Sequence, residues 1–290
     1  MSGMASDLKE PIGVVPREHR FRHDGNAARW YIGGDPVPSV LFSALSGTSP
    51  LGEKFFIDSV RRYRHCVDSS MAENIDRFIV QEALHTREHL KLNRLIRQSG
   101  YTIANMTERT RRTLAPFRKR TPLRQVGLTM ALEHFTALLA HEVLTNEDRF
   151  MRAPASVRAL WRWHALEEIE HKAVAFDTFQ AATKSWSRPR RYLFRIAAMM
   201  EGSVVLFPVV GRNMNDLFRQ DKLPPWMIWR RVAKYLLGRR GLLWSILPGY
   251  WRWFKPGFHP WQIDDRMLMH KAADELTQGD PLRSARTARP

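Results

Sequence analysis

Two Glu-x-x-His motifs, each in a long stretch without glycine or proline, constrain the fold of this chain more than any other feature. The first is Glu82 to His85, in a run from residue 71 to residue 99, and the second is Glu168 to His171, in a run that continues to about residue 184. Residues three apart lie on the same face of an α-helix, so each motif can present a carboxylate and an imidazole to one metal ion. A single motif of this kind is also common as a solvated charge pair, and its meaning depends on the residues around it.

Two further glutamates fall on largely apolar faces of predicted helices. Glu53 belongs to a helix predicted over residues 50–66, and Glu133 belongs to one over residues 123–146. Burying a carboxylate on such a face is costly unless it is paired or bound to a metal. In chain order the set is Glu, Glu-x-x-His, Glu, Glu-x-x-His, the pattern of ferritin-like dinuclear carboxylate bundles. We therefore predict that two metal ions are held by Glu53, Glu82, His85, Glu133, Glu168 and His171.

The spacing of these residues agrees with two antiparallel helix pairs, because ligands on antiparallel helices must lie at one level. The midpoint between Glu53 and the first motif falls near Asp68, in a predicted turn, and the midpoint between Glu133 and the second motif falls just before Pro154. Residues 100–122 are long enough for the crossover that a ferritin-like topology requires. We predict an all-α fold, a ferritin-like four-helix bundle followed by a C-terminal helical extension.

The chain divides into four parts by composition. In chain order they are an irregular leader with a short helix (1–48), the four-helix bundle (49–184), a basic, Trp-rich helical extension (185–282) and a disordered tail (283–290). The extension is predicted to contain helices at about 190–206, 225–237 and 264–276.

The charge of the chain favours anionic partners. Lys and Arg number 46 against 29 Asp and Glu, a net charge of +17. Seven of the ten tryptophans lie in residues 185–290, interleaved with arginines. This mixture suits a lipid surface, with rings at head-group depth and cations toward phosphates, and equally suits a helical annex packed on the bundle with solvated basic edges. No helix-turn-helix or RNA-recognition signature accompanies the charge, so nucleic acid is not an expected partner. The oligomeric state is left open.

The sequence predicts a cytoplasmic protein, with a peripheral contact at the inner face of the membrane as an added role for its C-terminal region. Residues 1–11 lack the apolar core of a secretory signal, and one cysteine, Cys66, excludes disulfide scaffolds and cysteine zinc sites. The most apolar segment, residues 196–211, is short and is interrupted by Glu201 and Pro208. We expect a buried helix there, with an interfacial helix or a membrane-embedded hairpin as the alternative.

Two histidines lie close to the predicted ligands and are predicted as catalytic residues. His89 lies one turn after His85, and His164 lies one turn before Glu168. Each could serve as an extra ligand, as an outer-sphere partner or as a proton carrier.

Other polar residues near the motifs receive different predictions. His134 and His141 are expected to be hydrogen-bonded helix histidines rather than ligands. Glu167 is placed so that it could reach the metals, whereas Glu170 is expected to be exposed to solvent.

Four segments around the ligands together resemble the bacterial family of predicted metal-dependent hydrolases, which is itself similar to ferritin-like proteins. These segments are residues 51–56, 78–89 followed by Asn93, 131–136 and 163–172, and residues 257–261 resemble the C-terminal signature of the family. The resemblance covers most of the chain and implies a metal-dependent enzyme. It assigns the metal residues to the six side chains already predicted.

The donor set suggests the metal and leaves the reaction open. Four carboxylates and two imidazoles suit iron first and manganese next, and give zinc no advantage. Two such ions could support O2-dependent oxidation, which we prefer slightly on chemical grounds, or two-metal hydrolysis. The expected substrate is hydrophobic and lipid-like. The alternative is a metal-storing or membrane-associated binding protein without catalytic turnover.

Overall fold

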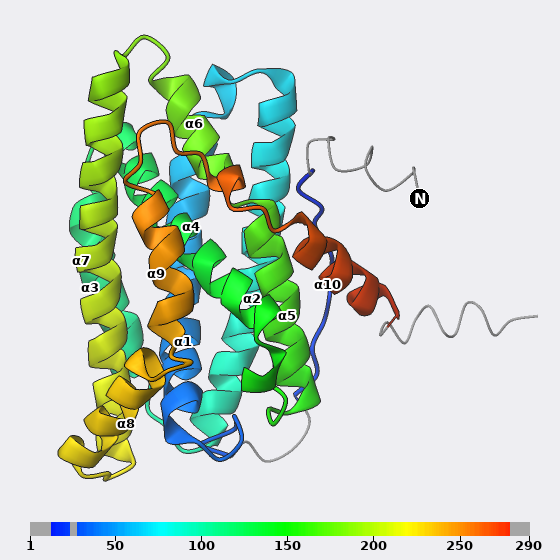
Figure 1. Cartoon of the computed structure of the whole chain (residues 1–290), viewed down its shortest axis with the longest axis vertical. Helices are drawn as coiled ribbons and strands as arrows, with labels where there is room; N and C mark the ends of the chain where they lie inside the picture. Colours follow the sequence, from blue (N-terminus) through cyan, green and yellow to red (C-terminus); the bar gives the residue numbers. More distant parts are fainter. Residues whose placement is uncertain (1–12, 24–27, 279–290) are drawn as a thin grey trace, which may run out of the picture.

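Helices form the regular structure of residues 13–23 and 28–278, the parts of the chain that the computed structural model describes, and no strand occurs there. The prediction of an all-α chain is confirmed. The predicted tail, residues 283–290, lies outside the described residues. Figure 1 shows the helices, which are in chain order α1 (Pro36–Arg61), α2 (Ser69–Gln98), α3 (Ala104–Arg118), α4 (Pro122–Thr145), α5 (Ala155–Glu170), α6 (Val174–Ala182), α7 (Arg188–Gln220), α8 (Pro225–Leu237), α9 (Leu242–Arg252) and α10 (Arg266–Gln278).

Four helices surround the interior in which the predicted ligands lie. Helix α1 packs against α2 and α4, and α5 packs against α4 and α2. The helix predicted to run from residue 155 to residue 184 is interrupted after α5 by a turn at residues 171–173, before α6 begins. His171 is the C-cap of α5, with φ −100° and ψ 5°. The interruption therefore falls on a predicted ligand.

Helix α1 is longer at its N-terminus than predicted. Asp35 caps the helix, its Oδ1 accepting from the Val37 backbone N–H at 3.0 Å, and the helix passes through Pro50 instead of starting there. Proline has no N–H to donate to the carbonyl four residues earlier. The side-chain amide of Asn93 on α2 donates to that carbonyl, Ser46 O, at 3.0 Å. The predicted start at residue 50 was wrong because a neighbouring helix satisfies the carbonyl that proline leaves unpaired.

The crossover and the extension contain more helix than predicted. Residues 100–122 include α3, and α7 is one helix of 33 residues that passes through Pro208. Helix α9 was not predicted. Helix α7 packs against α1, α3 and α4.

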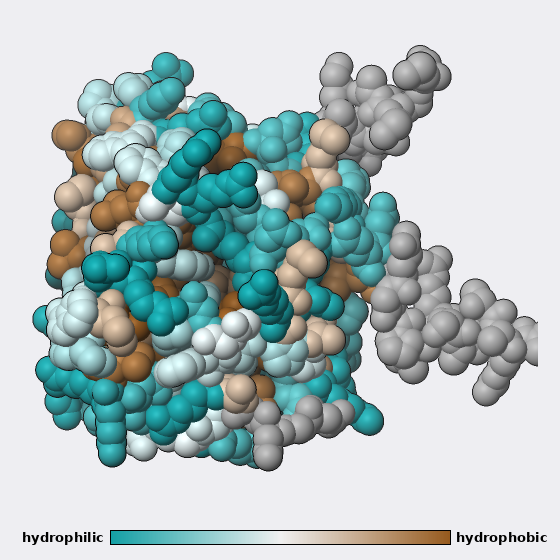
Figure 2. Space-filling view, turned by 60° about the horizontal axis from the view of Figure 1, so that its bottom comes forward, coloured by the Kyte–Doolittle hydropathy of each residue, from teal (hydrophilic) through white to brown (hydrophobic). Residues whose placement is uncertain are grey.

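Only one face of α7 is buried, so the expected buried helix is buried in part. Helix α7 is long and apolar enough to cross a membrane by length and composition, but only a third of its most apolar 18-residue stretch is buried. Its exposed apolar side chains include Leu193, Met200, Val204 and Phe207. Figure 2 shows hydrophobic residues along the left edge of the molecule, the side on which α7 lies in Figure 1.

The C-terminal segment is attached to the bundle by buried polar contacts. Lys172 Nζ donates to Asp265 Oδ2 at 2.5 Å, and His141 Nδ1 lies 2.6 Å from Asp265 Oδ1. His134 Nε2 donates to the Gly249 carbonyl at 3.1 Å. His134 and His141 are therefore hydrogen-bonded helix histidines, as predicted.

Candidate metal centre

The structure brings the six predicted ligands into one buried volume. Glu53 comes from α1, Glu82 and His85 from α2, Glu133 from α4, and Glu168 and His171 from α5 and its C-cap. All six are buried. Because Glu53 and Glu133 lie among buried apolar residues of α1 and α4, packing these helices together also brings the carboxylates together.

These side chains form overlapping groups, each with the spacing of a metal site. In one group His171 Nε2 lies 3.3 Å from Glu82 Oε1, 3.3 Å from Glu133 Oε2 and 3.4 Å from Glu168 Oε2. The ligand atoms of each group lie within 4.8 Å of one another. The groups are Glu82, Glu133, Glu168 and His171; Glu53, Glu82 and His85; His85, His164 and Glu168; and Glu53, His89 and His164. Five residues belong to two groups each, namely Glu53, Glu82, His85, His164 and Glu168, so the groups form one continuous cluster.

Buried atoms without a hydrogen-bond partner make this volume a candidate cation site. Within the described residues they include Glu53 Oε1, both oxygens of Glu82, His85 Nδ1, both oxygens of Glu133, Glu168 Oε2 and His171 Nε2. Buried polar atoms are normally paired, and a buried unpaired charge is costly. A set of acceptor atoms turned toward one another is stabilised by cations between them, so these residues fit metal ions.

The same crowding shifts the pKa values of the carboxyl groups. Burial raises the pKa of Glu53 to about 8 and that of Glu133 to about 7. Burial, followed by the charges of Glu133 and Glu168, raises the pKa of Glu82 well above its ordinary value. For Glu168 burial acts in the same direction, but His171 and His164 outweigh it and hold the pKa well below the ordinary value. Without cations, it is unfavourable for all the carboxyl groups of this cluster to be ionised at the same time.

Outer hydrogen bonds orient both predicted histidine ligands. Gln81 Oε1 lies 3.0 Å from His171 Nδ1, and because an amide oxygen only accepts, His171 carries a proton on Nδ1 and turns Nε2 toward the carboxylates. Glu167 Oε2 lies 3.1 Å from His85 Nε2 and leaves His85 Nδ1 free in the same way. Such partners fix the tautomer of a ligating histidine. Glu167 therefore lies behind His85, and sequence reasoning missed Gln81.

The N-terminal segment covers this side of the site. The Arg17 backbone N–H donates to Glu167 Oε1 at 2.8 Å, and the Arg17 guanidinium donates to Glu170 Oε1 at 2.6 Å. The expectation that Glu170 is exposed was wrong, since it is buried and also accepts from Gln81 at 2.9 Å. Residues 13–23 have no regular secondary structure and pass along the outside of the bundle beside α5 (Figure 1). No sequence signal predicted the role of Arg17, because its partners Glu167 and Glu170 are 150 and 153 residues away along the chain.

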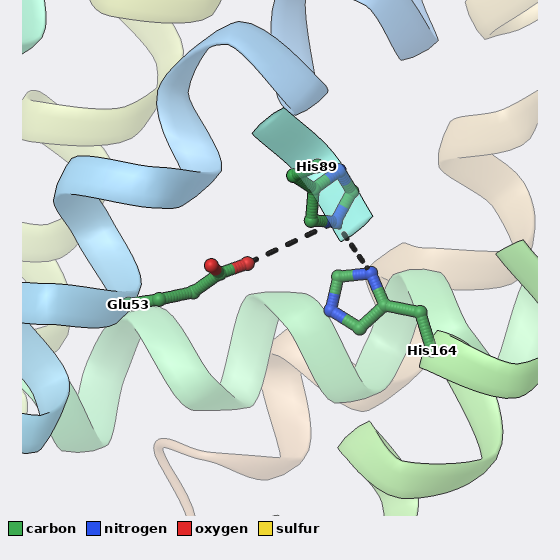
Figure 3. A group of neighbouring side chains, drawn as sticks. All are labelled: Glu53, His89 and His164. Atoms are coloured by element: carbon green, nitrogen blue, oxygen red, sulfur yellow. Dashed lines mark hydrogen bonds and ion pairs between the residues drawn. The ribbon is translucent and has the colours of Figure 1, made fainter. Parts of the chain in front are cut away.

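His89 and His164, predicted as catalytic, lie beside Glu53 (Figure 3). His89 Nε2 lies 2.9 Å from His164 Nδ1 and 3.8 Å from Glu53 Oε1. His164 Nε2 in turn lies 2.7 Å from Glu168 Oε1. The two rings thus extend the cluster along the side that faces α1.

Hydrogen-bond directions decide which atom of His164 is a donor. Asn93 donates its amide hydrogen to the Ser46 carbonyl, so its oxygen accepts from the Ser46 hydroxyl at 3.0 Å. Ser46 Oγ then accepts from His89 Nδ1 at 3.0 Å, and His89 Nε2 accepts from His164 Nδ1. This chain leaves His164 Nε2 as an acceptor facing Glu168 Oε1. Two acceptors at this distance need a proton or a cation between them.

The comparison with family models agrees with this site. A family model described as predicted metal-dependent hydrolase matches residues 15–264. The chain belongs to this family. The comparisons with curated proteins and with solved structures give no match. The six predicted ligands, His89 and His164 all lie within the matched range, and the family description agrees with a metal requirement.

In this member of the predicted metal-dependent hydrolase family, an apolar cavity reaches the cluster. The cavity has a volume of about 140 Å³ and lies among α1, α3, α4, α5 and α7. Its walls include Phe56, Phe135 and Leu206, and its lining also includes Glu53, His164 and Glu168. A second, smaller cavity of about 60 Å³ shares His164 and Glu168 with it. The cluster is therefore open to a ligand of mainly hydrophobic character.

Proposed function

We propose that this chain is a dinuclear metal enzyme with a ferritin-like four-helix bundle formed by α1, α2, α4 and α5. Two ions are held by Glu53, Glu82, His85, Glu133, Glu168 and His171. The observation that carries this proposal is the set of unpartnered oxygen and nitrogen atoms from these six side chains, all buried and turned toward one volume. Overlap of the groups at Glu82 and Glu168 supports two ions rather than one.

The proposal extends to His164 as a further ligand. Its Nε2 lies 2.7 Å from Glu168 Oε1, and burial, followed by the charge of His85, lowers the pKa of His164. A lowered pKa disfavours the imidazolium that would otherwise supply the proton between these atoms. His89 then acts as a positioning residue that holds the proton on His164 Nδ1.

The donor set favours iron, with manganese next, because carboxylates and imidazoles are hard or intermediate ligands. When bound, such ions supply either redox capacity for O2-dependent oxidation or Lewis acidity and activated water for hydrolysis. The residues of the chain bind and orient: the apolar walls of the cavity hold a hydrophobic, lipid-like substrate and exclude water around Glu53 and Glu168. We give oxidation the first place because the walls of the substrate cavity away from the cluster are almost entirely apolar, and hydrolysis the second because the family description favours it.

Metal analysis of the purified protein, followed by anaerobic reduction and exposure to air, tests this function. We expect about two ions per chain, as for other dinuclear carboxylate bundles, and an iron-derived absorption change when air is admitted. A colourless, air-insensitive protein that cleaves model esters supports hydrolysis instead. Uptake of many ions per chain without turnover supports metal storage, and a protein that binds no metal contradicts the proposal.

A further inference from the structure

A basic groove between α3 and α7 adjoins the apolar cavity. The groove has a volume of about 450 Å³ and is lined by Asn105, Glu108, Arg109, Arg112, Thr113 and Arg212. Thr113 also lines the cavity that contains Glu53 and Glu168. The groove and the cavity are therefore neighbours, one polar and the other apolar, that share a wall.

The groove is held in shape by contacts between its two helices. Arg109 of α3 pairs with Asp216 of α7 at 2.5 Å and also donates to Asn213. At one end Gln220 accepts from the Thr102 backbone N–H at 2.7 Å. These bonds fix the separation of α3 and α7, so the groove does not depend on a ligand to form.

The cations of the groove differ in how far they are already neutralised. Arg109 is paired within the protein, and Arg112, which is mostly exposed, pairs with Glu108 at 2.7 Å. Arg212 is exposed and has no hydrogen bond or ion pair within residues 13–23 and 28–278. A planar guanidinium with free donors suits a carboxylate or a phosphate. The groove therefore offers an anion one unpaired arginine and a second that can be shared.

We propose that this groove binds the anionic head group of a single-chain amphiphile, a carboxylate or a phosphate, while the apolar chain occupies the neighbouring cavity. This inference rests on the proposed function, because it takes the cavity as the substrate site. It specifies the orientation of the bound substrate. The head group lies between α3 and α7, and the apolar chain rather than the head group faces Glu53, His164 and Glu168.

Isothermal titration of the purified protein with dodecanoate, dodecyl phosphate and dodecan-1-ol tests the inference. We expect both anions to bind about fivefold more tightly than the alcohol, a difference of the size that an exposed charge pair provides. Arg212→Ala should remove this difference and leave the affinity for the alcohol unchanged. Arg118→Ala is the matched control, because Arg118 lies on α3 and pairs with Asp58, and neither residue lines the groove.

The same titrations on metal-free protein separate this inference from the proposed function. A preference for the anions that depends on Arg212 with or without metal supports the groove, even if the metal proposal fails. A preference that disappears on metal removal and survives Arg212→Ala places the head group on the metals and overturns the inference. Equal binding of all three compounds, or equal losses in the Arg118 and Arg212 variants, overturns it as well. Leu206→Trp, which fills the cavity, should weaken all three ligands; unchanged binding would show that the chain lies elsewhere.

Discussion

Two of the groups of buried charged side chains that the structure describes differ in whether each charge has a partner. Around Asp265, both carboxylate oxygens are used, one by Lys172 and the other by His141. In the cluster at the centre of the bundle, most carboxylate oxygens have no donor within the described residues. The first group attaches the C-terminal segment to the bundle. In the second group the unpartnered oxygens have the spacing of a metal site, and this difference separates a structural contact from a candidate binding site.

The difference has an energetic consequence. Removing one partner from a buried ion pair leaves an uncompensated charge and is strongly destabilising. Removing one carboxylate from a cluster of unpaired carboxylates relieves repulsion instead, as long as no metal is bound. The same type of substitution should therefore act in opposite directions on the metal-free protein in the two regions.

The largest expected effect is the loss of metal in Glu82→Ala. Glu82 belongs to two of the ligand groups, so its removal should lower metal affinity by more than the ~100-fold that loss of an outer-sphere partner can cost. The metal-free variant should be at least as stable as the metal-free wild type, because burial and two neighbouring carboxylates already raise the pKa of Glu82. Metal analysis and urea unfolding measure the two effects.

Glu142→Ala is the matched control for this variant. Glu142 is as buried as Glu82 and lies on α4, but it accepts from Arg149 at 2.5 Å and from Asn146 at 2.8 Å. The control should keep its metal and lose stability. Full metal content in Glu82→Ala would show that the ligand assignment is wrong.

The next effect in size is the destabilisation expected for Asp265→Ala. The substitution leaves Lys172 buried without its partner carboxylate, and we expect the free energy of unfolding to fall by about 3–5 kcal/mol. Urea unfolding of the metal-loaded protein measures this change, with the metal content as a control that should not alter. Replacing both partners, Lys172→Met with Asp265→Leu, should recover much of the loss. A fall below about 1 kcal/mol in the single variant would mean that the contact is as weak as a surface pair.

The Asp265 contact also predicts a dependence on pH. Burial raises the pKa of Asp265, but the hydrogen bond from His141 and the charge of Lys172 outweigh burial and lower it below 3.8. The folded-state pKa is then below that of the unfolded chain, so the stabilisation is complete above the unfolded pKa and is lost as the pH falls through the folded pKa. Unfolding free energies measured below about pH 4, near the ordinary pKa of Asp, should fall more steeply in the wild type than in Asp265→Asn. If the unfolding free energies of the two proteins fall equally steeply with decreasing pH, Asp265 makes no such contribution.

A smaller effect is expected for the residues that orient the ligands. Gln81→Ala removes the acceptor for His171 Nδ1, and outer-sphere changes of this kind weaken metal binding by roughly 10–100-fold. Gln125→Ala is a suitable control, because Gln125 is also buried but donates to the backbone carbonyls of Arg118 and Arg120. Competition with a chelator measures both affinities. Equal affinities in the two variants would mean that Gln81 only packs.

The residues that could be predicted from the sequence are those whose role follows from spacing along one helix. The Glu-x-x-His motifs predicted helices and a shared face. The midpoints between ligands on successive helices predicted where the turns lie. The outer partners could not be found in this way, because Gln81, Arg17 and Ser46 act through residues on other elements. Pro50 shows the same limit: proline normally starts or breaks a helix, and only the position of Asn93 in space allows α1 to continue through it.

The exposed side of the extension is expected to give the smallest effect, a weak contact with anionic membranes. Trp244 and Trp251 of α9 are exposed, and Trp251 lies next to Tyr250, whose hydroxyl is 3.3 Å from Ser203 Oγ on α7. The apolar face of α7 and the exposed rings of α9 are thus adjacent. Residues 185–290 contain 19 basic and 8 acidic residues, a net charge of 19 − 8 = +11, so an anionic surface is the complementary partner.

Sedimentation with phosphatidylglycerol vesicles, compared with phosphatidylcholine vesicles, measures this contact. We expect binding to the anionic vesicles alone, weakened by the double variant Trp244→Ala and Trp251→Ala, since the amphipathic rings of tryptophan lie at head-group depth. Met267→Ala is the control, because Met267 is the most exposed of the large apolar side chains described and lies on α10, across the molecule from α7 (Figure 1). Equal losses in the control, or binding that does not depend on lipid charge, would show that exposed apolar residues act here without a defined membrane face. The extension would then have only the structural role that its contact through Asp265 already has, which is to cover the bundle.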